Sequence, residues 1–237
     1  MGIKERQERD REAVRRSILD AARELFVTEG FQNVSIRKIA EKIEYSPAAI
    51  YGYFAGKDDI FFALAEEGFR LLCDGSRADT RSTRTPLDQV RMRFERLYEF
   101  SREQPQYFAL MFLERSVPRI SKEYERFAFA REMKRHIAAE IQRAIDSGEL
   151  PATVKPIIAM RLLISGVLGV VLLRLSDRLP VGENADDIAS DVLDTTLAGL
   201  RSGIAFKSRG VDLDFPEPPA EDPATAPVLR PASSRSR

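Results

Sequence analysis

The residues best placed to do chemistry lie in one stretch, 34–60, and they indicate binding rather than catalysis. Lys57 is expected in the first turn of a helix, where the helix dipole favours the neighbouring Asp58 and Asp59 and disfavours a cation. A lysine held there indicates an anionic partner such as a phosphate. The helix just before it has a small, flat exposed face that can lie close against another surface. That face comprises Ala48, Ala49, Gly52 and Tyr53.

Two helix-start signals define the elements that would position these residues. Ser35 is an N-cap before apolar residues at helical spacing, and Ser46-Pro47 is a second cap followed by a proline at the first helical position. Tyr45 and Ile50 can form a hydrophobic staple across the second cap. Two short helices joined by a tight turn can place the second helix in the major groove of DNA. Another kind of helical hairpin would give the same pattern, and Lys57 favours DNA.

This stretch resembles the DNA-binding segment of the TetR family of bacterial repressors, whose pattern is T-[IV]-x-x-I-A-x-x-A-G-V-S-x-x-x-[LI]-Y-x-[HY]-F-x-x-K-x-x-[LI]. One departure is Glu44 at the glycine of the turn, where a non-glycine residue must adopt a strained backbone conformation. The residues in register are Ser35, Ile36, Ile39, Ala40, Ser46, Ile50, Tyr51, Tyr53, Phe54, Lys57 and Ile60.

The resemblance implies a role for each matching position. Phosphate contacts are implied for Ser35, Tyr51, Tyr53 and Lys57. The positions that face bases are Pro47, Ala48, Ala49 and Gly52, beginning after the Ser46 cap. Residues 47–49 carry no hydrogen-bonding side chains, so direct readout by them must be apolar, for instance to thymine methyl groups. Arg37 is added because a long cation at the start of its helix can reach the groove edge or a phosphate.

Composition gives no bulk attraction to nucleic acid. The 237 residues contain 37 basic and 37 acidic side chains, and 43% of the residues are hydrophobic, enough for a core. Residues 1–57 carry 11 basic and 9 acidic side chains, a difference of +2, so affinity for DNA must come from placement. The single cysteine, Cys73, and the lack of an apolar secretory signal in residues 1–16 indicate a cytoplasmic protein.

The chain divides into a three-helix DNA-binding head, residues 12–72 with the helix–turn–helix at about 35–54, and a larger helical body, residues 87–205. A polar loop over 74–86 separates them, and a proline-rich tail, 207–237, is expected to be disordered. We therefore predict an all-α fold of about nine helices. Residues 3–16 mix charges at helical spacing. They are either a solvated helix start or a basic arm along the phosphate backbone, and the role of their arginines is open.

The body contains a cluster of aromatic and methionine side chains that either lines a ligand pocket or is plain core. A pocket so apolar would suit a small hydrophobic or aromatic ligand. The cluster comprises Phe94, Tyr98, Tyr107, Phe108, Met111, Phe112, Tyr124, Phe127 and Met133.

The last two helices, within 153–204, are expected to form the dimer surface, a four-helix bundle as in the resembled family. Twelve residues without a charge lie between Arg161 and Arg174, fewer than the roughly 20 that span a bilayer. We therefore expect no membrane span, although a membrane-surface protein is an alternative. The residues expected at the dimer interface are Gly166, Gly169, Leu173, Leu193 and Leu197.

No catalytic or metal-binding motif is present in the sequence. The one histidine, His136, has no partner at metal-ligand spacing, and no phosphate-binding glycine loop or nucleophile motif occurs. We expect no enzyme activity, cofactor or metal. The resemblance implies a homodimeric repressor that binds a palindromic operator and is released by a small ligand. The alternative is a ligand-independent DNA-binding activator or architectural protein.

Overall fold

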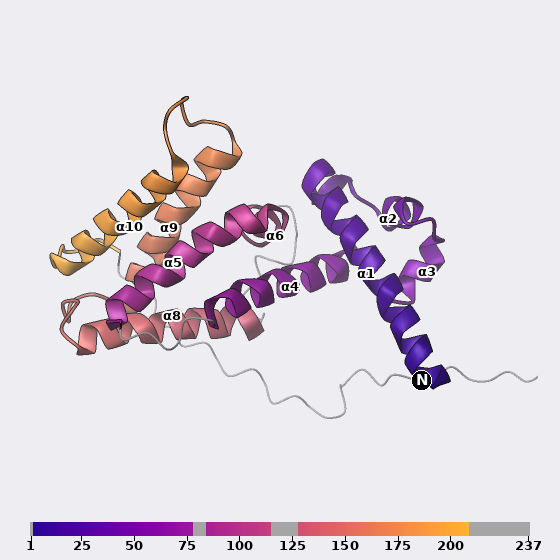
Figure 1. The fold of residues 1–237 in the computed structure, drawn as a ribbon, viewed down its shortest axis with the longest axis horizontal. Coiled ribbons are helices and arrows are strands. Elements are labelled where there is room, and N and C mark those ends of the chain that lie inside the picture. The colour runs from indigo at the N-terminus through magenta and orange to yellow at the C-terminus, as the bar shows by residue number, and fades with distance from the viewer. Residues whose placement is uncertain (1, 78–83, 115–127, 209–237) are drawn as a thin grey trace, which may run out of the picture.

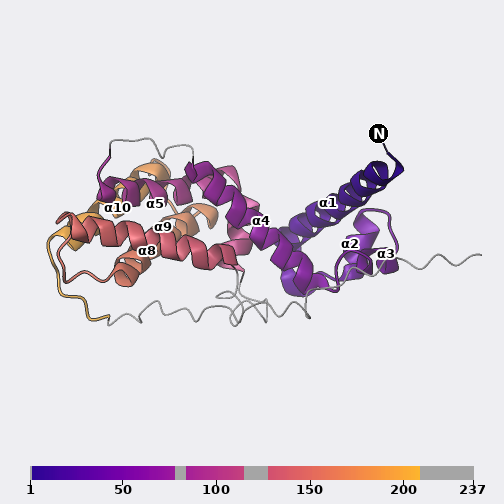
Figure 2. The ribbon, with the colours of Figure 1, turned by 90° about the horizontal axis from the view of Figure 1, so that it is seen from below.

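The computed structural model describes residues 2–77, 84–114 and 128–208. Within these ranges the chain forms nine α-helices, a short 3-10 helix and a π-helical segment, with no strand, so the all-α prediction is confirmed. Figures 1 and 2 show a head of α1–α3 and a larger body of α5–α10, with α4 running between them. The predicted pocket residues Tyr124 and Phe127, and the tail from residue 209, lie outside the described residues.

Three helices and one short turn build the head. Helix α1 (Ile3–Glu29) ends at Gly30, whose φ is 79°, and η1 (Phe31–Asn33) follows. Helices α2 (Ile36–Lys42) and α3 (Pro47–Tyr51) begin at the predicted caps, where Ser35 and Ser46 accept hydrogen bonds from the amides of residues 38 and 49. Each cap satisfies a backbone donor that the first turn of a helix leaves unpaired.

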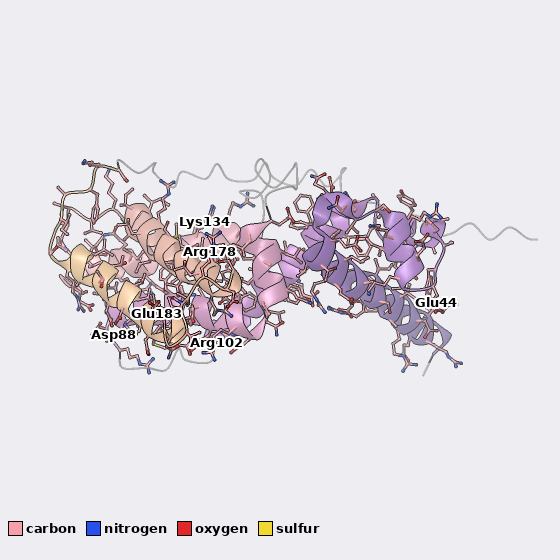
Figure 3. All side chains as sticks on the ribbon, turned by 90° about the horizontal axis from the view of Figure 1, so that it is seen from above. Glu44, Asp88, Arg102, Lys134, Arg178 and Glu183 are labelled. Carbon is pink, nitrogen blue, oxygen red and sulfur yellow. The ribbon has the colours of Figure 1, made fainter. Side chains whose placement is uncertain are left out.

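The turn between α2 and α3 contains Glu44, labelled in Figure 3. Its φ is 60°, the left-handed region that costs a residue with a side chain roughly 1–2 kcal/mol. The amide of the next residue, Tyr45, donates to the Ala40 carbonyl at 2.9 Å. This bond closes the end of α2 and fixes the direction in which α3 leaves.

Helix α4 (Lys57–Arg77) packs against both parts of the molecule. Phe61 and Leu64 are buried in the head, where the Phe61 ring lies 5.4 Å from the ring of Phe31, centroid to centroid. Further along α4, Phe69 is buried, and its ring lies 6.0 Å from the ring of Phe112 in the body. The expectation that the polar loop starts at residue 74 is wrong, because α4 continues to Arg77.

Five α-helices and the π-helical segment form the described part of the body. Helix α5 (Pro86–Glu103) starts at a Thr85 cap, and α6 (Pro105–Phe108) runs directly into η2 (Ala109–Leu113). Helix α8 (Ala128–Asp146) ends just before Gly148, whose φ is 78°. Helices α9 (Pro156–Leu175) and α10 (Ala185–Arg201) lie side by side along α5, as Figure 1 shows.

Helix α9 is the core helix of the body. Among the described helices it alone is long and apolar enough to cross a membrane, by length and composition, with a mean hydropathy of 2.3. It nevertheless packs against α5, α8 and α10, as a helix that is apolar nearly all round must do in a globular protein. Its buried side chains are Ile157, Ile158, Ala159, Met160, Leu163, Val167, Val170 and Val171.

Candidate nucleic-acid interface and its junction with the body

The recognition helix α3 presents a surface without charge. Pro47, Ala48 and Gly52 are exposed and Ala49 is half-buried, while Ile50 points into the head. The Tyr51 side chain is 58% exposed, so its hydroxyl is the reachable polar group of α3. This surface can make apolar contact with base edges at close range, and it has no side chain for bidentate hydrogen bonding.

Tyr45 was not recognised from the sequence as a surface residue. Its side chain, predicted to form a hydrophobic staple with Ile50, is 45% exposed just before the recognition helix. The resembled pattern has valine at this position. The tyrosine that replaces it in this sequence was the signal that could have identified an exposed residue here. Tyr45 thus joins the candidate DNA-contacting residues.

Every cation of α2 has a carboxylate partner within the head. Arg37 Nε donates to Glu41 at 2.8 Å, and this hydrogen bond raises the pKa of the guanidinium. Lys38 Nζ lies 2.5 Å from a Glu29 carboxylate oxygen. Lys42 Nζ lies 2.9 Å from Glu24. These pairs are exposed, and solvent screens exposed ion pairs strongly, so a phosphate can displace the carboxylates at little cost.

Lys57 has a structural role that the dipole argument did not predict. Its ammonium donates to the carbonyl oxygens of Phe31 at 2.9 Å and Val34 at 3.0 Å, and it lies 4.3 Å from the centre of the Phe31 ring. The lysine therefore ties the start of α4 to the end of η1. Two of its three donors are used inside the head, so the dipole does not by itself require a phosphate partner.

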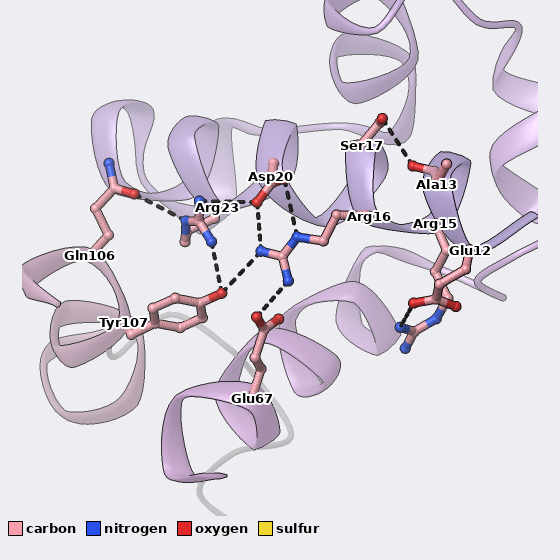
Figure 4. Close-up of polar contacts among 10 residues, drawn as sticks. All are labelled: Glu12, Ala13, Arg15, Arg16, Ser17, Asp20, Arg23, Glu67, Gln106 and Tyr107. Carbon is pink, nitrogen blue, oxygen red and sulfur yellow. Dashed lines mark hydrogen bonds and ion pairs between the residues drawn. The ribbon is translucent and has the colours of Figure 1, made fainter. Parts of the chain in front are cut away.

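A polar cluster joins the head to the body at the crossing of α1, α4 and α6 (Figure 4). Arg16 of α1 donates to Asp20 at 2.6 and 3.1 Å, to Glu67 of α4 at 2.5 Å and to the Tyr107 hydroxyl of α6 at 3.2 Å. The hydrogen bonds to Asp20 raise the pKa of Arg16, and in return they hold the pKa of Asp20 below its usual range. The pair stays charged at any physiological pH.

A second arginine of α1 completes this junction cluster. Arg23 donates to the Tyr107 hydroxyl at 2.7 Å and to the Gln106 amide oxygen at 3.1 Å, and it pairs with Asp20 at 3.0 Å. Burial raises the pKa of Tyr107, so its hydroxyl stays protonated. The sequence signal was the spacing Arg16, Asp20, Arg23, which puts three charges on one face of α1.

The Tyr107 ring and Met111 lie against the backbone of α4 at Gly68. A Cβ on Gly68 would overlap the Met111 sulfur and would approach the Tyr107 ring to 3.2 Å. The Phe108 and Phe112 rings lie 4.9 Å apart, centroid to centroid, in the continuous segment of α6 and η2 that also carries Tyr107. Part of the predicted aromatic cluster is thereby in direct contact with α4.

The other predicted pocket residues are distributed around this contact. Phe94 is buried, Met133 is half-buried, and Phe112 packs half-buried against the core. Tyr98 points elsewhere, because its hydroxyl donates to Asp186 of α10 at 2.8 Å. Burial and that carboxylate raise the pKa of Tyr98 to about 12. Tyr98 therefore belongs to the packing of α5 on α10.

Of the five residues predicted at the dimer interface, only those on the exposed side of α9 are available to a partner. Leu193 and Leu197 are buried inside the chain, so neither is available to a partner. Gly166 is also used internally, because a Cβ there would overlap Val192 of α10. Gly169 and Leu173 do face outward, and a Cβ on Gly169 would meet open space. Four exposed positions of α9 recur at spacings of three and four and form a stripe: Leu162, Ser165, Gly169 and Leu172.

Comparisons with known proteins agree with this division. Residues 18–64 match the sequence model of the bacterial regulatory proteins of the tetR family. Residues 94–196 match that of the tetracyclin repressor-like C-terminal domain. The HTH-type transcriptional repressor Rv1474c of Mycobacterium tuberculosis is 44% identical over 55 residues, 23% of this chain and 29% of that protein. The HTH-type transcriptional activator FasR of Mycolicibacterium smegmatis is 26% identical over 102 residues, 43% of this chain and 47% of FasR. The chain thus spans less than half the length of these relatives.

Solved structures share the fold over most of their length. The fatty acid degradation regulator FadR of Bacillus halodurans matches 78% of this chain and 95% of its own, with a TM-score of 0.65 and 16% identity. FadR of Bacillus subtilis, solved in complex with stearoyl-CoA, matches 77% and 97%, with a TM-score of 0.66 and 18% identity. Family models match residues 18–64 and 94–196, and these solved structures share the fold over 77–78% of this chain, so the chain belongs to the TetR family of bacterial DNA-binding transcriptional regulators.

Proposed function

We propose that this protein is a cytoplasmic, homodimeric repressor that binds a palindromic operator and leaves it when a small apolar ligand enters the body. The observation that carries the proposal is the capped helix–turn–helix, whose recognition helix exposes Pro47, Ala48, Tyr51 and Gly52 and carries no charge. Family membership supports the same function.

Base readout by α3 is apolar in this proposal. Ala48, Ala49 and the Pro47 ring contact thymine methyl groups, and Tyr45 and Tyr51 add exposed rings and hydroxyls at the two ends of α3. Phosphate contacts come from Ser35, Tyr53 and the cations of α2, including Arg37, which exchange their carboxylate partners for phosphates. The expected operator is therefore rich in A·T pairs at the positions that α3 faces.

The dimer forms through the exposed stripe of α9 together with the small exposed residues Thr195 and Ala198 of α10. Leu162 and Leu172 supply apolar area, and Gly169 between them allows a close approach of a second α9. A two-fold axis through this surface pairs the same residues on both subunits. It also sets the distance between the two recognition helices.

The ligand is proposed to be a long apolar molecule, such as a fatty acyl compound, that lies among the aromatic residues next to α4. Supporting this, Tyr107, Met111 and Phe112 touch α4 directly, and the stearoyl-CoA complex of Bacillus subtilis FadR has the same fold. Displacing Tyr107 would also disturb the junction cluster, because its hydroxyl accepts hydrogen bonds from Arg16 and Arg23 of α1. Ligand entry and head orientation are coupled in this way.

Selection of bound duplexes from a random pool tests the DNA-binding part. Enrichment of a two-fold palindrome, with half-sites about 10 bp apart and A·T pairs at their centres, is expected. An enriched site without two-fold symmetry would contradict the dimeric reading. DNA binding that no apolar compound changes would instead favour a ligand-independent activator or architectural protein.

A further inference from the structure

Helix α1 begins well before the part of it that packs in the head. Residues 4–13 are exposed, and the first fully buried side chain is Ile18. At 1.5 Å per residue, residues 3–13 make an overhang about 16 Å long. Figure 1 shows these first turns extending beyond α3 on the side of the head away from the body. The core of the head does not require this length.

An open groove of about 430 Å³ lies between this overhang and the end of the recognition helix. The Arg11 guanidinium lies 5.7 Å from the centre of the Tyr53 ring, and Arg15 lies 5.3 Å from the Phe54 ring. These contacts hold two cations of α1 beside α3. The groove is lined by Gln7, Asp10, Arg11, Val14, Gly52 and Tyr53.

The overhang also holds cations that have no carboxylate partner. The cations of α2 are all paired within the head, and Lys57 is bound to backbone carbonyls. Among the described residues, no ion pair involves Lys4, Arg6, Arg9 or Arg11. Helical spacing puts Lys4, Arg11 and Arg15 on one side of α1, because the intervals of seven and four residues are close to whole turns. Arg9 falls on the other side.

We propose that this side of α1 and the end of α3 form a second phosphate-binding surface, which holds the DNA backbone flanking the bases that α3 reads. Arg11 and Lys4 supply charge, the Gln7 amide and the Tyr53 hydroxyl supply hydrogen-bond donors, and Gly52 leaves space for the backbone. Asp10 lies in the same groove and opposes the phosphate, so it limits affinity. This inference rests on the proposed operator binding and adds a contact outside the recognition helix.

The test compares Arg11→Gln with Arg9→Gln, because both remove one exposed charge from the same helix. Arg11→Gln is expected to weaken binding to the selected operator about 5- to 10-fold at 0.1 M salt and to reduce the salt slope by about one. Arg9→Gln is expected to change neither by more than twofold. Asp10→Asn should shift affinity the other way, towards tighter binding. Circular dichroism checks that α1 stays helical in each variant.

Trimming the duplex locates the contact. The Arg11→Gln effect should vanish on an operator cut back to the bases that α3 covers, because the flanking phosphates are then absent. Equal effects of Arg9→Gln and Arg11→Gln, or a loss that persists on the trimmed duplex, would overturn the inference while leaving operator binding intact. Failure of the unaltered protein to bind any selected duplex would instead reject the proposed function itself.

Discussion

The head and the body satisfy their polar groups in different ways. In the head, Ser35 and Ser46 bond to amides three residues away, and Arg37 pairs with Glu41 on the next turn. In the body, Tyr98 bonds to Asp186, 88 residues later. Arg93 of α5 likewise donates to the buried carboxylate of Glu140 on α8 at 2.6 Å. These bonds stabilise single helices of the head, whereas those of Tyr98 and Arg93 join separate helices of the body.

The charged residues of α2 and those of the junction cluster also differ in burial. Cations on the α2 surface form exposed pairs that cost little to exchange. The arginines at the junction share Asp20, Glu67 and Tyr107 in a partly buried cluster. The first set is suited to meet DNA, and the second is suited to transmit a change in the body to α1.

The largest expected effect comes from the outer side of α9. Gly169→Arg places a charge on the proposed partner surface, at a position where a Cβ meets no atom of its own chain within 4 Å. The variant should therefore fold as a monomer and lose about 10²- to 10⁴-fold in operator affinity, because the two half-sites are no longer held together. Light scattering gives the mass. The control is Gln142→Arg, which adds the same charge at an exposed position of α8. A Gly169→Arg protein that remains dimeric would contradict the proposed dimer surface.

The position of α9 that packs against α10 should respond through stability. Gly166→Ala drives a methyl group into Val192, and such overpacking typically costs about 1–3 kcal/mol. Gly169→Ala meets no atom of its own chain within 4 Å of the new Cβ, so at a protein concentration where the chain is monomeric it should gain up to about 1 kcal/mol from helix propensity. Urea unfolding at matched protein concentration measures both. If the two alanine variants have equal midpoints, Gly166 is not needed for the contact of α9 with α10.

At the junction, Tyr107→Phe keeps the ring against Gly68 and removes only the hydroxyl. Arg16 and Arg23 each lose an acceptor, so unfolding free energy should fall by about 1–3 kcal/mol. Tyr51→Phe removes an exposed hydroxyl from α3 and should stay within about 0.5 kcal/mol in the absence of DNA. A junction variant as stable as Tyr51→Phe would show that the cluster does not hold head and body together.

The smallest effect is expected in the turn of the head. Glu44→Gly relieves roughly 1–2 kcal/mol of left-handed strain at φ 60°, offset by about 0.4–1 kcal/mol from the greater freedom of the unfolded chain. Net stabilisation of up to about 1.6 kcal/mol should appear as a raised thermal midpoint. Glu41→Gly, inside α2, should instead lower the midpoint. A lowered midpoint in Glu44→Gly would mean that the glutamate side chain stabilises the turn.

How much could be predicted from the sequence follows the same division. The caps at Ser35 and Ser46 and the strained position at Glu44 were readable because each depends on neighbours within four residues. The internal hydrogen bonds of Lys57 could not be predicted, because its partners are carbonyl groups 23 and 26 residues earlier in the chain. A charge placed against a helix dipole indicates an acceptor, and the sequence does not show whether that acceptor is internal.

In the body, the hydrophobic periodicity predicted the helices, but it did not predict which of their apolar residues remain exposed. Leu193 and Leu197 have the spacing of an interface, and the structure buries them inside the chain. Gly166 and Gly169 are equivalent in sequence terms, yet one receives Val192 and the other is open. The junction cluster was missed for a similar reason, because Arg16 and Tyr107 are 91 residues apart.

In the proposed function, ligand and operator oppose each other through α4 and the junction cluster. The most direct measurement is the affinity for an apolar ligand found by thermal shift, with stearoyl-CoA as the first probe, determined with and without saturating operator. Coupling of about 1–3 kcal/mol is expected, with the operator weakening the ligand by the same factor as the ligand weakens the operator. Equal ligand affinity in the two titrations would contradict the claim that this protein is a ligand-released repressor.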